Sequence, residues 1–520
     1  PSKGLLDDAK SRPFERISAY AKMGKNDLQK YRKKYIEHQK NIFSNYFDSI
    51  EAYPLTEDQV DACIIDEDNN LVLAGAGTGK TSTMVGRAGF LLNSNQAQPK
   101  DILMLAFANK ASKEMQERMQ ERIKRDDLSI STFHKLGIKI ISDVEGAKPS
   151  LSKYAEDHET KDSVFKRDVN LWVNEFLKDD AYKDKVIKYF EDYLFIEKSP
   201  FSFESQGEYF SYVEAEEIRT FKGEKVKGYG ERIVANFLFK MGIEYEYEAS
   251  YQYKTKSMDF RQYKPDFYLP EYDAYIEHFG TDKNGNTAPY IDKEKYHQGM
   301  EWKRKIHENH KTVLIETFFH EHIDGSLRTK LTKKLKDAGI ECKPIPNDAV
   351  IETLRENKEL TEFAILMSKI IKRYKANWFD QKKLNSKINA SPHKKHLNIA
   401  LELMMPLKDR YDKILIEQDD IDFDDMIGKA LEYVLNGRFK PQWKYIMVDE
   451  FQDISDPRAR LVKALKDKAA DCSLFCVGDD WQAIYRFAGS DISFTTGFTN
   501  YFGVTQFTKL KKTFRFNSSI

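Results

Sequence analysis

The segment LVLAGAGTGKTS, residues 71 to 82, constrains the fold of this chain more than any other part of the sequence. It places a short apolar strand directly before a glycine-rich loop and a helix. The glycines allow backbone N–H groups to turn toward a triphosphate, while Lys80 can reach the outer phosphates and Thr81 can bind Mg²⁺. The segment therefore predicts a P-loop that binds ATP, although Ala74 stands where the usual pattern has its first glycine.

Short apolar strands alternate with amphipathic helices on both sides of a long insertion. Strands are expected at 70–74, 102–107 and 130–133, and the same alternation returns at 445–448 and 474–477. This pattern is typical of a parallel α/β sheet. Since about 300 residues of different character lie between the two stretches, we predict one sheet divided by an insertion.

Acidic residues at the end of a late buried strand complete the predicted nucleotide site. The segment YIMVDEFQD, residues 445 to 453, places an apolar strand before several carboxylates. Asp449 is expected to hold Mg²⁺, and Glu450 is expected to orient and deprotonate the attacking water. A solvated acidic loop is the alternative interpretation.

The ordered motifs resemble superfamily 1A DNA helicases of the UvrD/Rep type, in particular their helicase IV-like branch. The resemblance covers residues 54–141 and 410–520 and rests on LTEDQ, the P-loop, LAFANKASKEM, STFHKLG, DFDDMI, VDEFQD and VGDDWQAIYRF. It implies an ATP-dependent helicase or translocase that uses Mg²⁺, binds single-stranded DNA and opens duplex DNA.

The resemblance also implies roles in the nucleotide site. Gln59 would contact the adenine base, and Arg87 occupies the position of a further nucleotide contact. Gln482 would sense the γ-phosphate, and Arg515 would stabilise the transferred negative charge. The implied ATP-binding residues are Gln59, Ala74, Gly75, Ala76, Gly77, Thr78, Gly79, Lys80, Thr81, Ser82, Arg87 and Phe514.

Contacts to single-stranded DNA are implied in the same way. Aromatic rings would stack on successive bases, each contributing about 1 to 3 kcal/mol, and polar side chains would contact the backbone. The expected stacking residues are Phe107, Phe133, Tyr485 and Phe487, and the expected backbone contacts are Asn109, Lys110, Thr132 and His134. Core packing is the alternative for each aromatic residue. The chain departs from many relatives at Ala488, where they carry an arginine that contacts the γ-phosphate.

The middle of the insertion resembles PD-(D/E)XK nucleases in its order of helix, strands and acidic residues. Its candidate carboxylates are Glu231, Asp266 and Glu277, which in such a fold surround Mg²⁺ or Mn²⁺ and activate water against a phosphodiester. Phe279 stands where the pattern has its lysine, and Lys303 on the next predicted helix is the expected replacement. An inactive DNA clamp and an unrelated sheet with surface acids are the alternatives.

The predicted architecture is an α/β, RecA-like lobe divided by a helical subdomain that carries the nuclease-like module. The predicted segments are a helical leader (1–53), the first part of the lobe (54–141), the first part of the helical subdomain (142–225), the nuclease-like module (226–325), the second part of the helical subdomain (326–435), the second part of the lobe (436–508) and the start of a second lobe (509–520).

Two further groups of residues lack a defined function. The histidines lack a metal-ligand spacing and are interpreted as core or surface residues: His297, His307, His310, His320 and His322. A basic run is interpreted either as a solvated helix face or as a track for a DNA backbone. Its members are Lys372, Arg373, Lys375, Lys382, Lys383, Lys394 and Lys395.

Composition limits the setting. The 83 basic and 83 acidic residues cancel, so DNA affinity has to come from local patches. The four cysteines cannot form a disulfide framework, which favours a reducing, cytoplasmic compartment. No apolar run approaches the roughly 20 residues that cross a bilayer, so no membrane association is expected. The sequence does not indicate the oligomeric state.

The end of the sequence suggests a further expectation. The second motor lobe of the family would begin shortly after Arg515. The chain alone is therefore expected to bind nucleotide, to hydrolyse it poorly and not to unwind DNA, with its nuclease residues all present. The alternatives are a nucleotide-switched DNA sensor with an inactive nuclease fold, and a P-loop kinase or unrelated ATPase. Both DNA repair and defence against foreign DNA are compatible settings.

Overall fold

The computed structural model describes residues 25–155, 163–256, 261–377, 381–479 and 493–514. The chain forms two compact units, each with its own core. The first comprises Pro1–Glu156, Lys372–Phe379 and Leu415–Ile520, and the second comprises Asp157–Ile371 and Asp380–Ile414. Among the described helices, none combines the length and the apolar character needed to cross a membrane.

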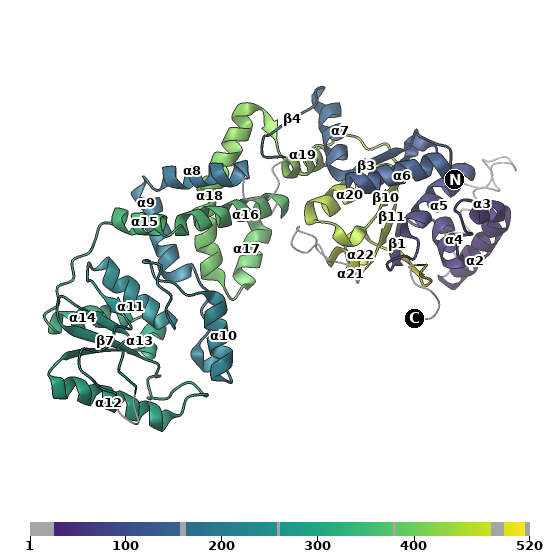
Figure 1. Cartoon of the computed structure of the whole chain (residues 1–520). Helices are drawn as coiled ribbons and strands as arrows, with labels where there is room; N and C mark the ends of the chain where they lie inside the picture. Colours follow the sequence, from purple (N-terminus) through teal and green to yellow (C-terminus); the bar gives the residue numbers. More distant parts are fainter. Residues whose placement is uncertain (1–24, 156–162, 257–260, 378–380, 480–492, 515–520) are drawn as a thin grey trace, which may run out of the picture. The chain divides into compact units, whose positions relative to one another are not determined.

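The first unit is built on a parallel sheet of six strands in the order β12-β1-β11-β10-β2-β3 (Figure 1). Its strands are β1 (Asn69–Ala74), β2 (Ile102–Ala106), β3 (Ser129–Thr132), β10 (Tyr445–Val448), β11 (Ser473–Gly478) and β12 (Gln506–Leu510). The prediction of one parallel sheet assembled from two distant stretches of sequence is confirmed.

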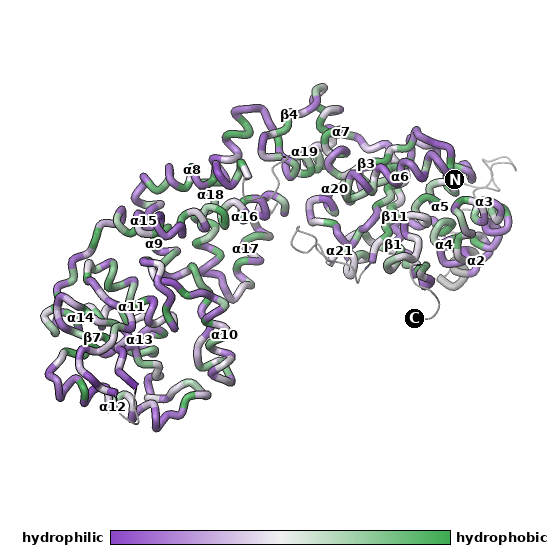
Figure 2. The backbone as a smooth tube through the Cα atoms, viewed as in Figure 1, coloured by the Kyte–Doolittle hydropathy of each residue, from purple (hydrophilic) through white to green (hydrophobic). Residues whose placement is uncertain are grey.

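Helices cover both faces of this sheet. One face packs against α7 (Phe133–Glu145), α19 (Phe423–Leu435) and α20 (Asp456–Lys468), and the other against α5 (Lys80–Asn93) and α6 (Asn109–Arg122). Burial of both faces explains why the strands are almost continuously apolar. In Figure 2 hydrophilic and hydrophobic colours alternate along the helices, as expected for helices packed on a core. Helix α19, predicted within the helical subdomain, belongs to this core.

The helical leader packs against the same unit. Its described helices are α2 (Lys25–Ile42) and α3 (Ser44–Ser49), followed by α4 (Glu57–Ile64). The rings of Phe43 and Phe47 lie 5.2 Å and 5.8 Å from the ring of Phe90 on α5. The leader therefore contributes to the core beside the P-loop helix.

Short pairings and ion pairs lie where the chain leaves and re-enters the first unit. Strand β4 (Ser150–Leu151) pairs in parallel with β9 (Asp420–Ile421). Nearby, Lys375 is buried and its Nζ lies 2.8 Å from Asp422 and 3.0 Å from Asp425. Neither interpretation of the basic run fits Lys375, because a buried ion-paired lysine is neither a solvated charge nor a DNA track.

The second unit contains mostly helices and one small sheet. Its helices include α8 (Val164–Phe176), α9 (Asp180–Lys188), α10 (Gln206–Glu216), α15 (Asn347–Glu356), α17 (Gln381–Ala390) and most of α16 (Glu359–Asn377) and α18 (Lys394–Gln418). In its core the Tyr182 hydroxyl donates to the carbonyl of Leu403, 3.1 Å away. The segments that precede and follow the inserted module in the sequence therefore pack against each other.

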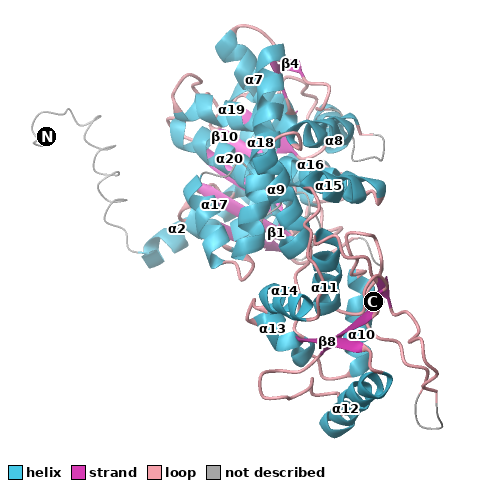
Figure 3. Ribbon diagram, turned by 90° about the vertical axis from the view of Figure 1, so that its left-hand side faces the viewer, coloured by secondary structure: helices cyan, strands magenta, loops and turns pink. Residues whose placement is uncertain are grey.

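The inserted module has a four-stranded sheet in the order β5-β6-β7-β8. Its elements are α11 (Tyr229–Lys240), β5 (Glu246–Tyr247), β6 (Phe267–Leu269), β7 (Ala274–Phe279), α12 (Lys293–His310), β8 (Val313–Phe318), α13 (Phe319–Ile323) and α14 (Leu327–Asp337). Strand β7 is antiparallel to β6 and parallel to β8. Figure 3 shows β8 beside α13 and α14.

The module continues beyond its predicted end at residue 325. Leu327, Leu331 and Leu335 of α14 are fully or almost fully buried in the core that α11 and the sheet form. The N–H of Lys343 also donates to the carbonyl of Met241 at 2.9 Å. A charged, amphipathic sequence concealed this role, because only one face of α14 is apolar.

Candidate nucleotide site and a second acidic site

The loop between β1 and α5 adopts a backbone conformation that requires glycine. Gly77 and Gly79 have φ angles of 72° and 85°, in the left-handed region. A Cβ atom on Gly79 would lie 2.2 Å from Nε2 of Gln59. Ala74 is buried at the end of β1. The loop therefore accepts alanine at its first position but not at Gly79.

A cavity of about 400 Å³ opens beside this loop. It is lined by Glu51, Ala52, Tyr53, Pro54, Leu55, Gln59, Gly77, Gly79, Lys80, Thr81, Ser82, Arg118 and Phe514. Two hydrogen bonds stabilise the loop. Thr78 Oγ1 donates to the Gly75 carbonyl at 2.8 Å, and Thr513 Oγ1 donates to the Ala76 carbonyl at 3.1 Å. The volume lies within the range of small-ligand sites.

The P-loop lysine is paired with the predicted catalytic glutamate. Lys80 Nζ lies 2.6 Å from Glu450 Oε2, although 370 positions separate the two residues in sequence. The same carboxylate oxygen accepts from Gln452 Nε2 at 2.7 Å. Glu450 has a φ of 47°, an uncommon value for a residue other than glycine. The sheet therefore brings together two residues that the sequence placed in one site.

Asp449 lies beside this pair and is 5% exposed. Burial, and then the charge of Glu450, raises the pKa of Asp449 to about 6. A cation bound by Asp449 and Thr81 would offset this concentration of negative charge, so the residues fit Mg²⁺. In the described part of the chain, however, no three His, Cys, Asp or Glu side chains form a ready metal cluster.

Gln59 lines the cavity and also supports the loop. Its Oε1 accepts from the N–H of Thr56 at 2.8 Å, and its Nε2 donates to the carbonyl of Thr78 at 3.0 Å. Thr56 and Gln59 form a capping box at the start of α4. Gln59 therefore lies at the cavity with its amide already hydrogen-bonded to the chain, and its contact with the adenine base stays a prediction.

Arg87 does not line the cavity. It is 1% exposed, and its guanidinium donates to the carbonyl of Cys63 at 2.8 Å and to Asp66 at 2.5 Å. It also lies 5.8 Å and 5.7 Å from the ring centres of Tyr445 and Phe475. The predicted nucleotide contact is corrected: Arg87 joins α5 to the sheet, because its charge is satisfied inside the protein.

Arg118 lines the cavity although no motif pointed to it. It extends from α6, and its guanidinium lies 3.0 Å from Glu114 and 3.8 Å from Glu51. The i,i+4 spacing of Glu114 and Arg118 was visible in the sequence, but such pairs are common on exposed helices. Only the fold shows that this helix face borders the nucleotide cavity.

The predicted DNA contacts divide into exposed and buried residues. Asn109 and Lys110 are exposed at the start of α6, and Phe107 is half-buried. Phe133 is 1% exposed, and its ring lies 5.6 Å from that of Phe107. The predicted stacking role of Phe133 is therefore wrong in this conformation, because the ring belongs to the core.

Thr132 and His134 are also less available than predicted. The Thr132 side chain is buried and caps α7 by accepting from the N–H of Lys135 at 3.3 Å. The His134 ring packs 5.0 Å from that of Phe423. Burial, and then the nearby charge of Arg458, lowers the pKa of His134 to about 4. Thr132 is thus a helix cap, and the His134 ring is neutral at neutral pH, while its contact with DNA stays a prediction.

Several predicted residues lie outside the described part of the chain. They are Gln482, Tyr485, Phe487 and Arg515. Their expected roles stay predictions.

A second acidic site lies in the inserted module, around Glu277 on β7. Glu277 is 1% exposed, and each of its carboxylate oxygens has a partner. Tyr263 donates to Oε1 at 2.7 Å, and Lys303 Nζ on α12 lies 2.5 Å from Oε2. The lysine expected from α12 therefore lies directly on the predicted glutamate.

Phe279 explains how Lys303 takes this position. Its ring is buried, and Lys303 Nζ lies 5.4 Å from the ring centre. Phe279 and Glu277 are two residues apart on one strand, so they face the same side of the sheet. The aromatic ring thus supports a lysine that approaches from the neighbouring helix.

Asp266 and Glu231 lie near Glu277. Asp266 accepts from the N–H of His278 at 2.7 Å, and Glu231 accepts from the Tyr247 hydroxyl at 2.5 Å. Burial, and then the charges of Glu277 and Glu231, raises the pKa of Asp266 well above its usual value. Since Mg²⁺ is often bound through one or two carboxylates and several waters, Asp266 and Glu277 fit such an ion.

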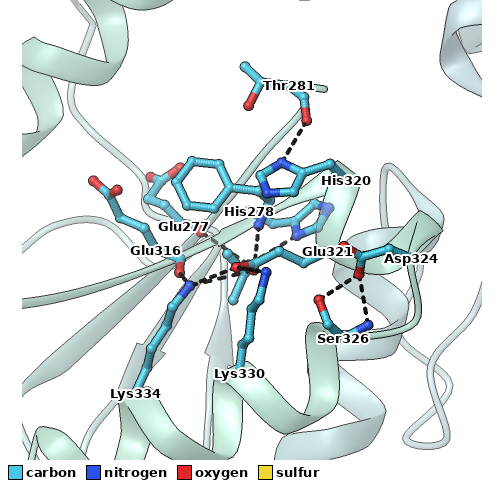
Figure 4. A network of polar contacts seen from close by, with 12 residues as sticks. Glu277, His278, Thr281, Glu316, His320, Glu321, Asp324, Ser326, Lys330 and Lys334 are labelled. Atoms are coloured by element: carbon cyan, nitrogen blue, oxygen red, sulfur yellow. Dashed lines mark hydrogen bonds and ion pairs between the residues drawn. The ribbon is translucent and has the colours of Figure 1, made fainter. Parts of the chain in front are cut away.

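A polar network that includes the backbone of Glu277 continues from this site to β8, α13 and α14 (Figure 4). Glu321 is buried there, with Lys334 and Lys330 3.1 Å and 3.5 Å from its Oε1. Next to Glu277 on β7, His278 lies 3.0 Å from the Thr317 hydroxyl. Because adjacent strand residues face opposite sides of a sheet, His278 points away from Glu277.

Comparison with known proteins bears on the whole chain. The family model described as the UvrD/REP helicase N-terminal domain matches residues 55–503. DNA helicase IV of Escherichia coli (strain K12) is 28% identical over 486 residues, which is 94% of this chain and 48% of that protein. A probable DNA helicase II homolog of Rickettsia conorii is 41% identical over 91 residues, covering 18% of this chain and 14% of that protein.

A third relative matches a similarly short segment. The ATP-dependent DNA helicase PcrA of Staphylococcus aureus is 34% identical over 89 residues, covering 17% of this chain and 12% of that protein. The chain spans about half the length of DNA helicase IV and much less of the other two relatives.

Proposed function

The chain belongs to the UvrD/REP helicase family, and on that premise we propose that its first unit is the ATP-binding lobe of a DNA helicase or translocase. The observation that carries this proposal is the 2.6 Å pair of Lys80 and Glu450 beside the nucleotide-sized cavity. DNA repair and defence against foreign DNA are the proposed settings.

The residues of the predicted nucleotide site have the following proposed roles. Lys80 would leave Glu450 and bind the outer phosphates of ATP. Glu450 would then be free to orient the attacking water and accept its proton. Thr81 and Asp449 would hold Mg²⁺, which supplies neutralisation of phosphate charge. Gln482 and Arg515 are proposed to contact the γ-phosphate, and Phe514 to lie beside the adenine.

DNA would bind near the exposed start of α6. Asn109 and Lys110 are proposed to contact phosphates, and Phe107 to contact a base. ATP hydrolysis measured with and without single-stranded DNA tests the motor proposal. Stimulation by DNA supports it, whereas hydrolysis that DNA leaves unchanged would favour an unrelated ATPase.

We propose a second activity, Mg²⁺- or Mn²⁺-dependent DNA cleavage, for the inserted module. The supporting observation is the convergence of Asp266, Glu277 and Lys303 from three elements. Asp266 and Glu277 would hold the cation, which lowers the pKa of a bound water. Lys303 would neutralise charge that develops on the phosphate, and Glu231 would be a third carboxylate of the catalytic group.

The alternative is a nucleotide-switched DNA sensor in which this module is inactive. Both proteins would bind DNA, so binding alone does not separate them. Labelled single-stranded and duplex DNA incubated with Mg²⁺ or Mn²⁺ does separate them. Cleavage supports a nuclease, and tight binding without cleavage at any concentration of either metal supports the sensor.

A further inference from the structure

A chain of hydrogen bonds extends from Glu277 through the interior of the inserted module. Tyr263 donates to Glu277 Oε1 at 2.7 Å, and the Tyr263 oxygen lies 3.2 Å from His307 Nε2. His307 Nδ1 lies 2.7 Å from Thr312 Oγ1, which lies 2.6 Å from the Tyr251 hydroxyl. These contacts connect β7 with α12 and with the segment that precedes β8.

The donor and the acceptor of each hydrogen bond in this series follow from the carboxylate of Glu277, where the series ends. An ionised Glu277 can only accept, so Tyr263 donates to it. The Tyr263 oxygen must then accept, so the proton on His307 lies on Nε2. A neutral imidazole carries one proton, so Nδ1 accepts from Thr312, and Thr312 accepts from Tyr251. All the hydrogen bonds therefore point toward Glu277.

The surroundings of His307 agree with a neutral ring. His307 is 2% exposed and packs among aromatic side chains, with the rings of Tyr251 and Tyr275 at 4.9 Å and 5.1 Å. Burial, and then the charges of His310 and Lys303, lowers the pKa of His307 to about 4. The ring thus donates through one nitrogen and accepts through the other at neutral pH.

We infer that His307 is a positioning residue for the nuclease-like site, acting through the Tyr263 hydroxyl to hold Glu277 ready to bind a divalent cation. Lys303 lies at Oε2, and in the described part of the chain Tyr263, which His307 supports, holds Oε1. The inference rests on the proposed nuclease function and assigns a role to a histidine that the sequence left without one.

A pair of substitutions separates positioning from packing. In His307→Gln the amide nitrogen can replace Nε2 as a donor, whereas His307→Leu fills the space without any donor. Removal of such supporting groups weakens metal binding or activity by about 10- to 100-fold. His310→Leu is the matched control, because His310 Nδ1 donates to the carbonyl of Ile306 at 2.9 Å and not to Tyr263.

The readouts are Mn²⁺ affinity, from the electron paramagnetic resonance signal of free Mn²⁺, and the kcat and KM of DNA cleavage. We expect His307→Leu to weaken Mn²⁺ binding and lower kcat by about tenfold or more, with an unchanged KM for DNA. His307→Gln should stay much closer to the wild type. His310→Leu should match the wild type in both readouts.

A double-mutant cycle with Tyr263→Phe tests the pathway. If His307 acts through Tyr263, the double variant Tyr263→Phe/His307→Leu should have the same Mn²⁺ affinity and kcat as Tyr263→Phe alone. Additive losses, equal losses in His307→Leu and His307→Gln, or a fully active His307→Leu would overturn the inference. A wild-type protein that neither binds Mn²⁺ nor cleaves DNA would instead remove the nuclease proposal, and the inference with it.

Discussion

Each of the two acidic sites of this protein contains a lysine paired with a glutamate, but the surroundings of the two pairs differ. In the first unit Lys80 lies 2.6 Å from Glu450, and in the inserted module Lys303 lies 2.5 Å from Glu277. The side chain of Glu450 is 38% exposed beside an open cavity, whereas that of Glu277 is 1% exposed. The same lysine–glutamate pair thus has a partly exposed carboxylate in one site and a buried carboxylate in the other.

The two lysines differ in how strongly their expected roles constrain the sequence around them. Lys80 belongs to a continuous loop whose backbone must wrap a phosphate chain, so its neighbours are fixed too. Lys303 has only to deliver a charge to one carboxylate, and any element that reaches Glu277 can do this. A continuous motif is therefore expected at the first site and not at the second.

The largest expected effect is the loss of ATP hydrolysis in Lys80→Ala. Removing the charge that binds the outer phosphates should lower the hydrolysis rate on the order of 10³-fold. DNA cleavage by the same preparation should be unchanged, because Lys80 and Lys303 serve separate sites. A parallel loss of cleavage would break the comparison.

The second effect is on the other lysine. Lys303→Ala should lower the rate of DNA cleavage on the order of 100-fold. Glu277 would lose its charged partner, and the phosphate would lose the group that neutralises its developing charge. Lys305→Ala is the matched control, since Lys305 is an exposed lysine on the same helix. Equal losses in both variants would show that α12 contributes only general positive charge.

Residues of continuous motifs could be predicted from the sequence, because the function expected there requires a continuous backbone. The P-loop, Asp449 and Glu450 were all predicted, and the sheet brings them together. The burial of Arg87, Phe133 and Thr132 could not be predicted, because burial depends on tertiary packing that the local sequence does not determine. Phe279 departs from the nuclease pattern, and its ring lies 5.4 Å from Nζ of Lys303, the lysine that the sequence offered as a replacement. Arg118 was missed because its helix face becomes informative only beside the cavity.

A smaller effect is expected from Gly79→Ala. Its Cβ would meet Gln59, and its left-handed φ adds strain, so ATP binding should weaken by about tenfold. Gly146→Ala is the control, because Gly146 also has a positive φ, of 76°, but its added Cβ would meet no atom within 4 Å. Equal ATP affinity for the two variants, measured with a fluorescent nucleotide, would contradict the tight contact at Gly79.

The smallest effect concerns stability and pH. The pKa of Asp449 is about 6 in the folded protein and 3.8 for the ordinary group, so ionisation favours the unfolded state. Ionisation of Asp449 therefore lowers the free energy of unfolding by about 1 to 3 kcal/mol. This loss is absent below about pH 4 and complete above about pH 6. Asp449→Asn should therefore raise the thermal midpoint at pH 7.5, with a gain that shrinks as the pH falls toward 4. A gain independent of pH would contradict this origin.

The most direct test of two separate centres is Glu277→Gln, which keeps the shape of the side chain and removes its charge. Cleavage of labelled DNA in Mg²⁺ or Mn²⁺ and DNA-stimulated ATP hydrolysis are measured on the same preparations. The account predicts that the wild type cleaves DNA, and that the variant loses cleavage but hydrolyses ATP at the wild-type rate. Cleavage that persists in Glu277→Gln, or a wild type that never cleaves, would contradict it.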